Sequence, residues 1–143
     1  LGLRPYPKPG AEYNIAMDIP AAQKVFTAGV PLYVMPLDST QLKLDEVKRQ
    51  AIFTHSTDLT DALTLLYHQW SGETKQQTPT MFDAVAVAYA IEPDLCPVTP
   101  LAIAVDDSGI TREVTGKPNT FVCLTSDSDQ FFEFYLPRIL RAP

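Results

Sequence analysis

The sequence lacks the short motifs that most readily identify an enzyme or a metal centre. It has two cysteines and two histidines, and neither Cys-x-x-Cys nor His-x-x-x-His occurs, so a zinc site is not expected. No Gly-x-Ser-x-Gly, Walker loop or dinucleotide-binding glycine pattern is present either. Any function must therefore be inferred from features that lie further apart in the chain.

Long apolar segments are also absent. The apolar run Ala84–Ile91 has eight residues, whereas a membrane-spanning helix needs about 20. The chain begins with Leu1 rather than methionine, and no basic segment followed by an apolar one is visible there, so no signal peptide is recognised. We therefore expect no membrane partner and a cytoplasmic location.

Positive charge is scarce relative to negative charge. The net charge is −6, which argues against a nucleic-acid partner because such proteins usually present a basic face. The 143 residues are 45% hydrophobic and 20% charged, as expected for one globular domain with a core. Two cysteines in a domain of this size are more often free buried thiols, so we expect this of Cys96 and Cys123, with a single disulfide as the alternative.

The order of apolar patterns and turn signals predicts an α/β fold, with a partly parallel sheet, flanking helices and a late antiparallel hairpin. Helices are expected over 18–27, from Ser39 or Thr40 to about Phe53, from Asp58 to Trp70 with Gly72 beyond the end, over 82–91 as a buried helix, and over 127–140 with an interruption at Pro137. Strands are expected over 30–37, 98–105, 109–115 and 119–126. Asp106–Gly109 is expected to form the hairpin turn.

One candidate functional residue is Asp83, which stands at the start of the apolar run. Thr80-x-x-Asp83 is a capping-box pattern, so Asp83 can simply favour the start of a helix. The alternative is a carboxylate held at the rim of a pocket. Spacing alone favours the capping role, and a single aspartate cannot make a Ca²⁺ site, which needs 6–8 oxygen ligands.

The second candidate is the pair Glu12 and Asn14, within Ala11–Asp18. If this segment is extended, both side chains point to one face. A carboxylate and an amide on one face can bind adjacent hydroxyl groups, as on a sugar. The alternative is an ordinary exposed strand face.

Three segments together resemble one family, the inosine–uridine-preferring nucleoside hydrolases. "EYNIAMDIPAAQKVFTAGVPLYVMPLDST" is similar to the family segment in which E-[FY]-N precedes a DP-AA pattern and LD-x-T. "MFDAVAVAYAIEPDL" resembles its later M-H-D-P-x-A-V-A segment, and "DSDQFFEFYLPRIL" its closing helix. The order and spacing agree over nearly all of the chain.

The resemblance implies hydrolysis of the N-glycosidic bond of ribonucleosides, or of a related ribosyl compound, by a Ca²⁺-bound water. By similarity, Glu12 and Asn14 match ribose-contacting positions, and Asp83 matches a carboxylate that binds both the metal and a ribose hydroxyl. Carboxylates near the sugar would stabilise the oxocarbenium-like charge that develops when the base leaves. The expected partner is a small nucleoside or ribosyl substrate.

The family's Asp-rich motif, D-x-D-x-G-x-D-D, is absent from the sequence. Residues 1–143 therefore correspond to the C-terminal half of the family domain. The general base and most Ca²⁺ ligands would lie upstream, no catalytic base is assigned in this chain, and this chain alone is expected to be inactive. The missing N-terminal half or another chain is an expected partner, with a homo-oligomer as an alternative. The alternative function is a non-catalytic sugar- or nucleoside-binding module with the same fold. A third hypothesis is that the chain is a purely structural partner of another chain.

Three positions depart from the family pattern. Phe82 stands where the family usually has a histidine associated with the leaving base, and Ala84 replaces the usual proline. Phenylalanine cannot protonate a nitrogen, but it can stack on a ring, so Phe82 is kept as a substrate-binding candidate. Tyr6 stands where some members carry a ribose-contacting asparagine.

Overall fold

The computed structural model describes residues 10–141 and shows an α/β protein with two small sheets. In the first sheet, β5 (Thr120–Cys123) lies between β1 (Tyr33–Val34), which is parallel to it, and β2 (Val98–Leu101), which is antiparallel. In the second, β3 (Ile103–Val105) and β4 (Thr111–Glu113) form an antiparallel hairpin. The predicted mixture of parallel pairing and a late hairpin is confirmed. Ala102 divides the single strand expected over 98–105 into β2 and β3.

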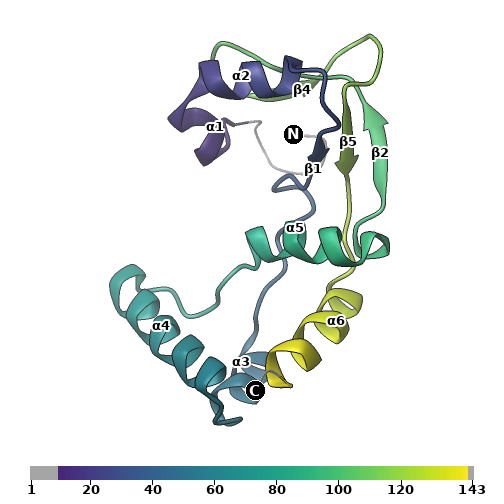
Figure 1. Cartoon of the computed structure of the whole chain (residues 1–143). Coiled ribbons are helices and arrows are strands. Elements are labelled where there is room, and N and C mark those ends of the chain that lie inside the picture. Colours follow the sequence, from purple (N-terminus) through teal and green to yellow (C-terminus); the bar gives the residue numbers. More distant parts are fainter. Residues whose placement is uncertain (1–9, 142–143) are drawn as a thin grey trace.

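The helices and the two sheets together form a C-shaped molecule (Figure 1). They are α1 (Tyr13–Met17), α2 (Ile19–Thr27), α3 (Glu46–Phe53), α4 (Asp58–Thr74), α5 (Phe82–Ile91) and α6 (Ser128–Leu140), with a short 3₁₀ turn at Pro93–Leu95. In Figure 1, α5 crosses the middle of the molecule. The sheets, α1 and α2 lie on one side of it, and α3, α4 and α6 lie on the other. This arrangement places the start of α5 at the inner side of the C.

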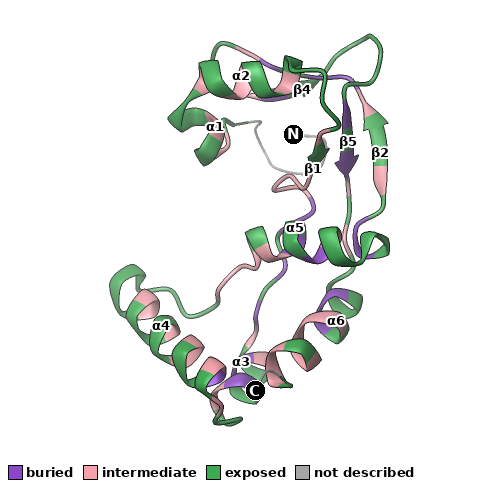
Figure 2. Cartoon of the chain, viewed as in Figure 1, coloured by how far each residue is buried: buried purple, intermediate pink, exposed green. Residues whose placement is uncertain are grey.

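The main core lies where α3, α5 and α6 meet the end of the first sheet. It contains buried residues of these elements and of the segments next to them: Leu42, Leu44, Ile52, Val85, Ala88, Leu95, Cys96, Cys123, Phe131 and Phe132. Figure 2 shows that burial is concentrated around these elements, whereas α1, α2 and α4 are mostly exposed. The prediction that α5 is a buried helix is therefore wrong in part, because Val87 and Ile91 are 62% and 61% exposed.

Cys96 and Cys123 form a disulfide, so the expectation of free thiols is wrong. The sheet register explains the pairing, because Val98 of β2 lies opposite Cys123 of β5. The chain entering β2 therefore brings Cys96 close to Cys123, with their Cα atoms 5.5 Å apart, inside the usual range for a disulfide. Both cysteines are fully buried.

The structure corrects two element boundaries in the first half of the chain. The strand expected over 30–37 is reduced to β1, because Pro31 and Pro36 flank it and have no backbone N–H to donate to a ladder. Helix α3 begins at Glu46 and not near Ser39 or Thr40, whose hydroxyls both donate to the Pro36 carbonyl. The carboxylate of Asp45 caps α3 instead, accepting from the Lys48 amide at 3.0 Å.

Two helix ends also differ from expectation. Helix α4 continues through Gly72 and ends at Thr74, because the chain turns at Lys75, which adopts a left-handed conformation with φ 60°. Helix α6 is not interrupted by Pro137, which is accommodated in its last turns. The Arg141 amide closes that end by donating to the Pro137 carbonyl at 3.1 Å. By contrast, the predicted bounds of α2 and α5 are confirmed, with Asp18 capping α2 as expected.

Candidate functional site

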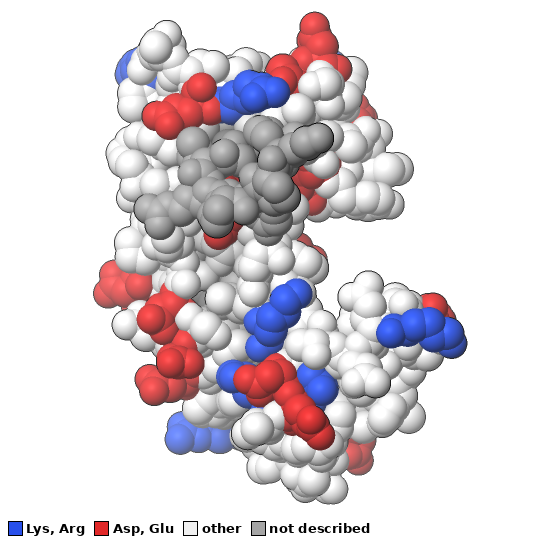
Figure 3. Space-filling model, turned by 180° about the vertical axis from the view of Figure 1, so that it is seen from behind, with Lys and Arg blue, Asp and Glu red and all other residues white. Residues whose placement is uncertain are grey.

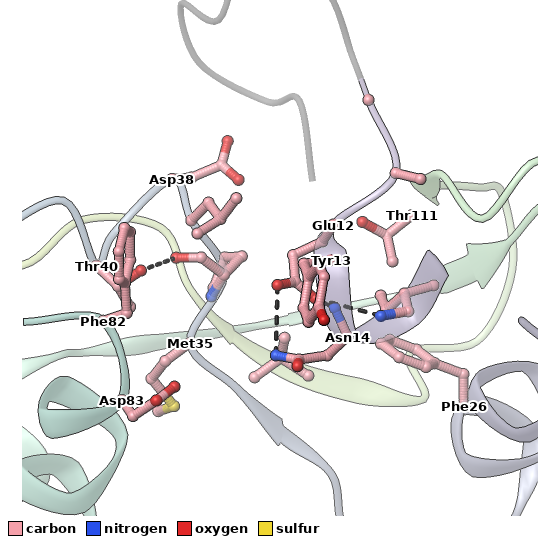
Figure 4. Close-up of a pocket in the computed structure, with 16 residues that line it drawn as sticks. Glu12, Tyr13, Asn14, Phe26, Met35, Asp38, Thr40, Phe82, Asp83 and Thr111 are labelled. Atoms are coloured by element: carbon pink, nitrogen blue, oxygen red, sulfur yellow. Dashed lines mark hydrogen bonds between the residues drawn. The ribbon is translucent and has the colours of Figure 1, made fainter. Parts of the chain in front are cut away.

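A cavity of about 710 Å³ contains all four site residues named from the sequence: Glu12, Asn14, Phe82 and Asp83. Figure 4 shows Glu12 and Asn14 entering from the α1 side and Phe82 and Asp83 from the start of α5. Almost 70 residues separate the two pairs in the sequence, so the fold creates this proximity.

The segment that carries Glu12 and Asn14 is helical, so the prediction that it is extended is wrong. Glu12 is the N-cap of α1: its Oε2 accepts from the amides of Asn14 at 3.0 Å and Ile15 at 3.4 Å. A capping carboxylate satisfies N–H groups that have no partner within the helix, and this favours a helical turn here. The two side chains nevertheless remain neighbours, because the Asn14 amide Nδ2 donates to Glu12 Oε1 at 3.4 Å.

This geometry leaves polar atoms available to a ligand. One oxygen of Glu12 is used for capping, and the other holds the Asn14 amide only through a long contact. Asn14 is exposed and Glu12 is half-buried at the cavity wall. A hydroxylated ligand could therefore accept from the Asn14 amide and donate to Glu12 without removing the cap of α1.

Asp83 lies in the first turn of α5 and is exposed to the cavity. The predicted capping box is wrong: the N-cap is Met81, and no side chain caps α5. The reason is that Thr80 pairs with Lys43 in an isolated antiparallel bridge, and its hydroxyl accepts from Lys43 Nζ at 2.5 Å. Only the capping-box part of the structural interpretation is wrong, because Asp83 still lies in the first turn of α5, where a negative charge favours the helix.

Phe82 lines a second cavity as well as the first. This second cavity, of about 610 Å³, lies between α4 and the elements around α5, and its wall includes the rings of Phe53, Tyr67, Trp70 and Tyr135. The Phe82 side chain is 41% exposed. Viewed from behind, the surface is notched between the upper body and the lobe of α4, with Lys or Arg side chains beside the notch (Figure 3). Phe82 thus lies between the cavity that contains Glu12 and Asp83 and a second, aromatic cavity.

Sequence reasoning missed several residues of the first cavity. Its wall also includes Tyr13, Phe26, Met35, Asp38, Thr40 and Thr111. Asp38 and Thr40 belong to the "LDST" segment, and the end of a strand next to a polar loop was a signal that could have identified them. Thr111 could not be found in this way, because only the fold of the β3–β4 hairpin brings it to the cavity. Tyr6 lies outside the described residues.

Among residues 10–141, no group of three or more histidine, cysteine, aspartate or glutamate side chains is arranged to hold a metal ion. Ca²⁺ usually takes 6–8 oxygen ligands, so Asp83 and its neighbours in this part of the chain do not form a complete calcium site. Within the same residues, no helix is long and apolar enough to cross a membrane.

Comparison with known proteins identifies the fold and the family. The family model for inosine–uridine preferring nucleoside hydrolases matches residues 6–133. The non-specific ribonucleoside hydrolase RihC of Shigella dysenteriae is 30% identical over 141 residues, which cover 92% of this chain and 46% of RihC. The pyrimidine-specific ribonucleoside hydrolase RihB of Shigella flexneri is 32% identical over 145 residues, covering 87% and 44% respectively.

Solved structures of nucleoside hydrolases have the same fold as this chain. A plant nucleoside hydrolase, PpNRh1, superposes with a TM-score of 0.81 at 21% identity, covering 96% of this chain and 50% of that one. A purine-preferring ribonucleoside hydrolase from Gardnerella vaginalis gives a TM-score of 0.78 at 23% identity, covering 92% and 46%. The chain therefore spans about half the length of the relatives it matches, as a partial, C-terminal-like part of the family domain.

Proposed function

Because this chain belongs to the inosine–uridine preferring nucleoside hydrolase family, we propose that it supplies the ribose-binding part of a ribonucleoside hydrolase. The reaction would cleave the N-glycosidic bond of a ribonucleoside or a related ribosyl compound. The observation that carries this proposal is the single cavity that brings Glu12 and Asn14 together with Asp83.

Glu12 and Asn14 are assigned to the sugar hydroxyls. Their side chains are joined at 3.4 Å, and an amide beside a carboxylate offers one donor and one acceptor at that spacing. Two neighbouring ribose hydroxyls can each both donate and accept, so they complement this pair. Binding at two points would also fix the orientation of the sugar ring, which lowers the entropic part of the barrier.

Asp83 is assigned to the electrostatic part of the reaction. It faces the same cavity from the α5 side. Departure of the base leaves positive charge on the ribosyl group, and a fixed carboxylate near that charge stabilises the transition state more than the ground state. The water-activating base has no counterpart among the residues assigned here and would be supplied by the other half of the family domain.

Calcium remains a proposal for the whole protein. Asp83 is the residue of this chain that would contribute a ligand, and its carboxylate is a ligand type that Ca²⁺ prefers. Since residues 10–141 contain no group of three or more histidine, cysteine, aspartate or glutamate side chains that could hold a metal ion, further carboxylate ligands would come from outside these residues.

Phe82 is assigned to the leaving group. It lines both the cavity that contains Glu12 and Asp83 and the aromatic cavity beside it, so a ribosyl group in the first cavity would place its base against the ring of Phe82. Stacking would hold the base but could not protonate it. Leaving-group protonation would then depend on another residue, or the substrate would have a leaving group that needs none.

We also propose that the other half of the family domain covers an open apolar face of the first sheet. The register places Tyr33 and Pro100 on either side of Phe121, forming a row across all three strands. Tyr33 is 49% and Phe121 36% exposed, and exposed apolar patches on a protein surface commonly mark interaction sites. A second copy of this chain is the alternative occupant.

The test of the proposed function is ribose release from a p-nitrophenyl riboside by the whole protein. The wild type is expected to turn over and an Asp83→Ala variant to lose activity. The alternative function, a non-catalytic binding module, is favoured by Phe82. Calorimetric binding of ribose or ribonucleosides by a wild-type protein that releases no product would support that alternative and contradict the hydrolase.

A further inference from the structure

The β3–β4 hairpin packs its turn against the segment that carries Glu12. Gly109, in this turn, has a φ of 78°, and a Cβ placed on it would lie 3.2 Å from the Ile19 side chain and 3.3 Å from the Ala11 Cβ. Ala11 directly precedes Glu12, and Ile19 is the first residue of α2. A side chain at Gly109 would therefore crowd the start of α2 and the residue before Glu12, and the Ile19 or Ala11 side chain would have to move by a few tenths of an ångström to admit it.

Hydrogen bonds extend this contact along α2. Gln23 Nε2 donates to the Val105 carbonyl at 3.2 Å and to Asp107 Oδ1 at 3.3 Å. At the far end, Asn119 Nδ2 donates to the carbonyls of Phe26 and Ile103, at 2.9 Å each. The hairpin is thus fixed along the whole length of α2, and α1 is joined to the start of that helix.

The turn itself is held by the Asp106 carboxylate. Its Oδ1 accepts from the Ser108 hydroxyl at 2.5 Å and from the amides of Ser108 and Ile110 at 3.0 Å, and its Oδ2 accepts from Arg112 Nε at 2.9 Å. A loop with this many internal bonds has few alternative conformations. It can therefore act as a fixed surface against which α1 is positioned.

We propose that the Asp106–Gly109 turn is a positioning element for the ribose-binding pair, with Gly109 as its contact residue. The proposal rests on the function assigned to Glu12 and Asn14 above. Gly109 touches no substrate; it acts by setting where the start of α1 lies. A shift of even part of an ångström at Ala11 would move the Glu12 carboxylate relative to Asp83 on the opposite wall.

The test compares two glycine substitutions with the same backbone penalty. Gly109→Ala adds a methyl group against Ile19 and Ala11, whereas Gly29→Ala adds one where nothing lies within 4 Å. Because φ is 78° at Gly109 and 73° at Gly29, both variants carry a similar strain from the left-handed conformation. A difference between the two variants in amide exchange or kinetics therefore arises from the contact of residue 109 with Ile19 and Ala11, and not from backbone strain.

The first readout is amide hydrogen exchange in the whole protein. The amides of Asn14 and Ile15 are the ones bonded to Glu12, so both should exchange roughly tenfold faster in Gly109→Ala than in Gly29→Ala, as expected when a local structure opens more often. Adding Ile19→Ala to Gly109→Ala, which removes the crowded side-chain atoms, should restore much of the protection. Equal exchange in the two glycine variants would overturn the proposal.

The second readout is the kinetics of riboside hydrolysis. Gly109→Ala should raise KM or lower kcat about tenfold, since small misplacements of a binding group have large effects on rate, and Gly29→Ala should match the wild type. If exchange differs but the wild type is inactive, the positioning contact stands and the proposed function fails. If the wild type is active and both variants keep its KM and kcat, the positioning role is contradicted.

Discussion

The disulfide allows a quantitative prediction about stability. Cys96 and Cys123 are 27 residues apart in sequence, and loop-closure entropy for a cross-link of that span amounts to roughly 3.5 kcal/mol at 25 °C. For a chain of 143 residues, with an unfolding entropy of about 2.1 cal/mol/K per residue, this corresponds to a loss of about 12 °C in Tm when the bond is removed.

The assay is urea or thermal unfolding followed by far-UV circular dichroism, with and without a reducing agent. Reduction of the wild type leaves both buried thiols in place, so its effect isolates the cross-link. A Cys96→Ala, Cys123→Ala double variant adds the cost of two small cavities and should be less stable still. An unchanged unfolding midpoint after reduction, or two free thiols by mass spectrometry of the untreated protein, would refute the reasoning.

Two further predictions concern the hairpin turn and the open sheet face. The hydrogen bond from the Ser108 hydroxyl, followed by those from the Ile110 amide and the Arg112 guanidinium, holds the pKa of Asp106 well below its ordinary value of 3.8. The stabilisation from this carboxylate is therefore present above pH 3.8 and is lost as the pH falls toward the lowered pKa. Asp106→Asn should accordingly lower the urea midpoint near pH 7, with a smaller difference from wild type in strong acid; a difference independent of pH would contradict this assignment. Since Tyr33, Phe121 and Pro100 form an exposed row among the residues that the structure describes, this chain alone should self-associate in light scattering, and Phe121→Ser should reduce the association. A monodisperse monomer of the unsubstituted chain would show that the face needs no cover.

The parts of the fold that could be predicted are those set by local chemistry. Asp18 and Pro20 start α2, and Asp106–Gly109 makes the turn between β3 and β4, because each of these residues acts on its own backbone. The elements that were misjudged depend on distant contacts. The bridge to Lys43 removes the predicted role of Thr80, and the ladder between β2 and β5 brings the two cysteines together.

In the candidate site, too, the features set by local sequence could be predicted and those set by distant contacts could not. Glu12, Asn14, Phe82 and Asp83 were identified by their motifs, and the structure places them in one cavity, yet their assigned roles stay predictions. The helical conformation of α1 was missed because capping by Glu12 outweighs an alternating pattern that runs only from Glu12 to Ile15. Thr111 and the close approach of Gly109 could not be predicted, since both arise from the packing of the hairpin against α2.

The measurement that tests the central claim most directly is turnover of a p-nitrophenyl riboside by three forms of the whole protein. These are the wild type, Asp83→Ala, and Asp94→Ala as a control that removes an exposed aspartate just beyond the other end of α5. The account predicts that Asp83→Ala lowers kcat/KM by about 100-fold or more, the usual effect of losing one group that stabilises the transition state, while Asp94→Ala keeps wild-type activity. Equal turnover by the wild type and Asp83→Ala, or none by the wild type, would contradict it.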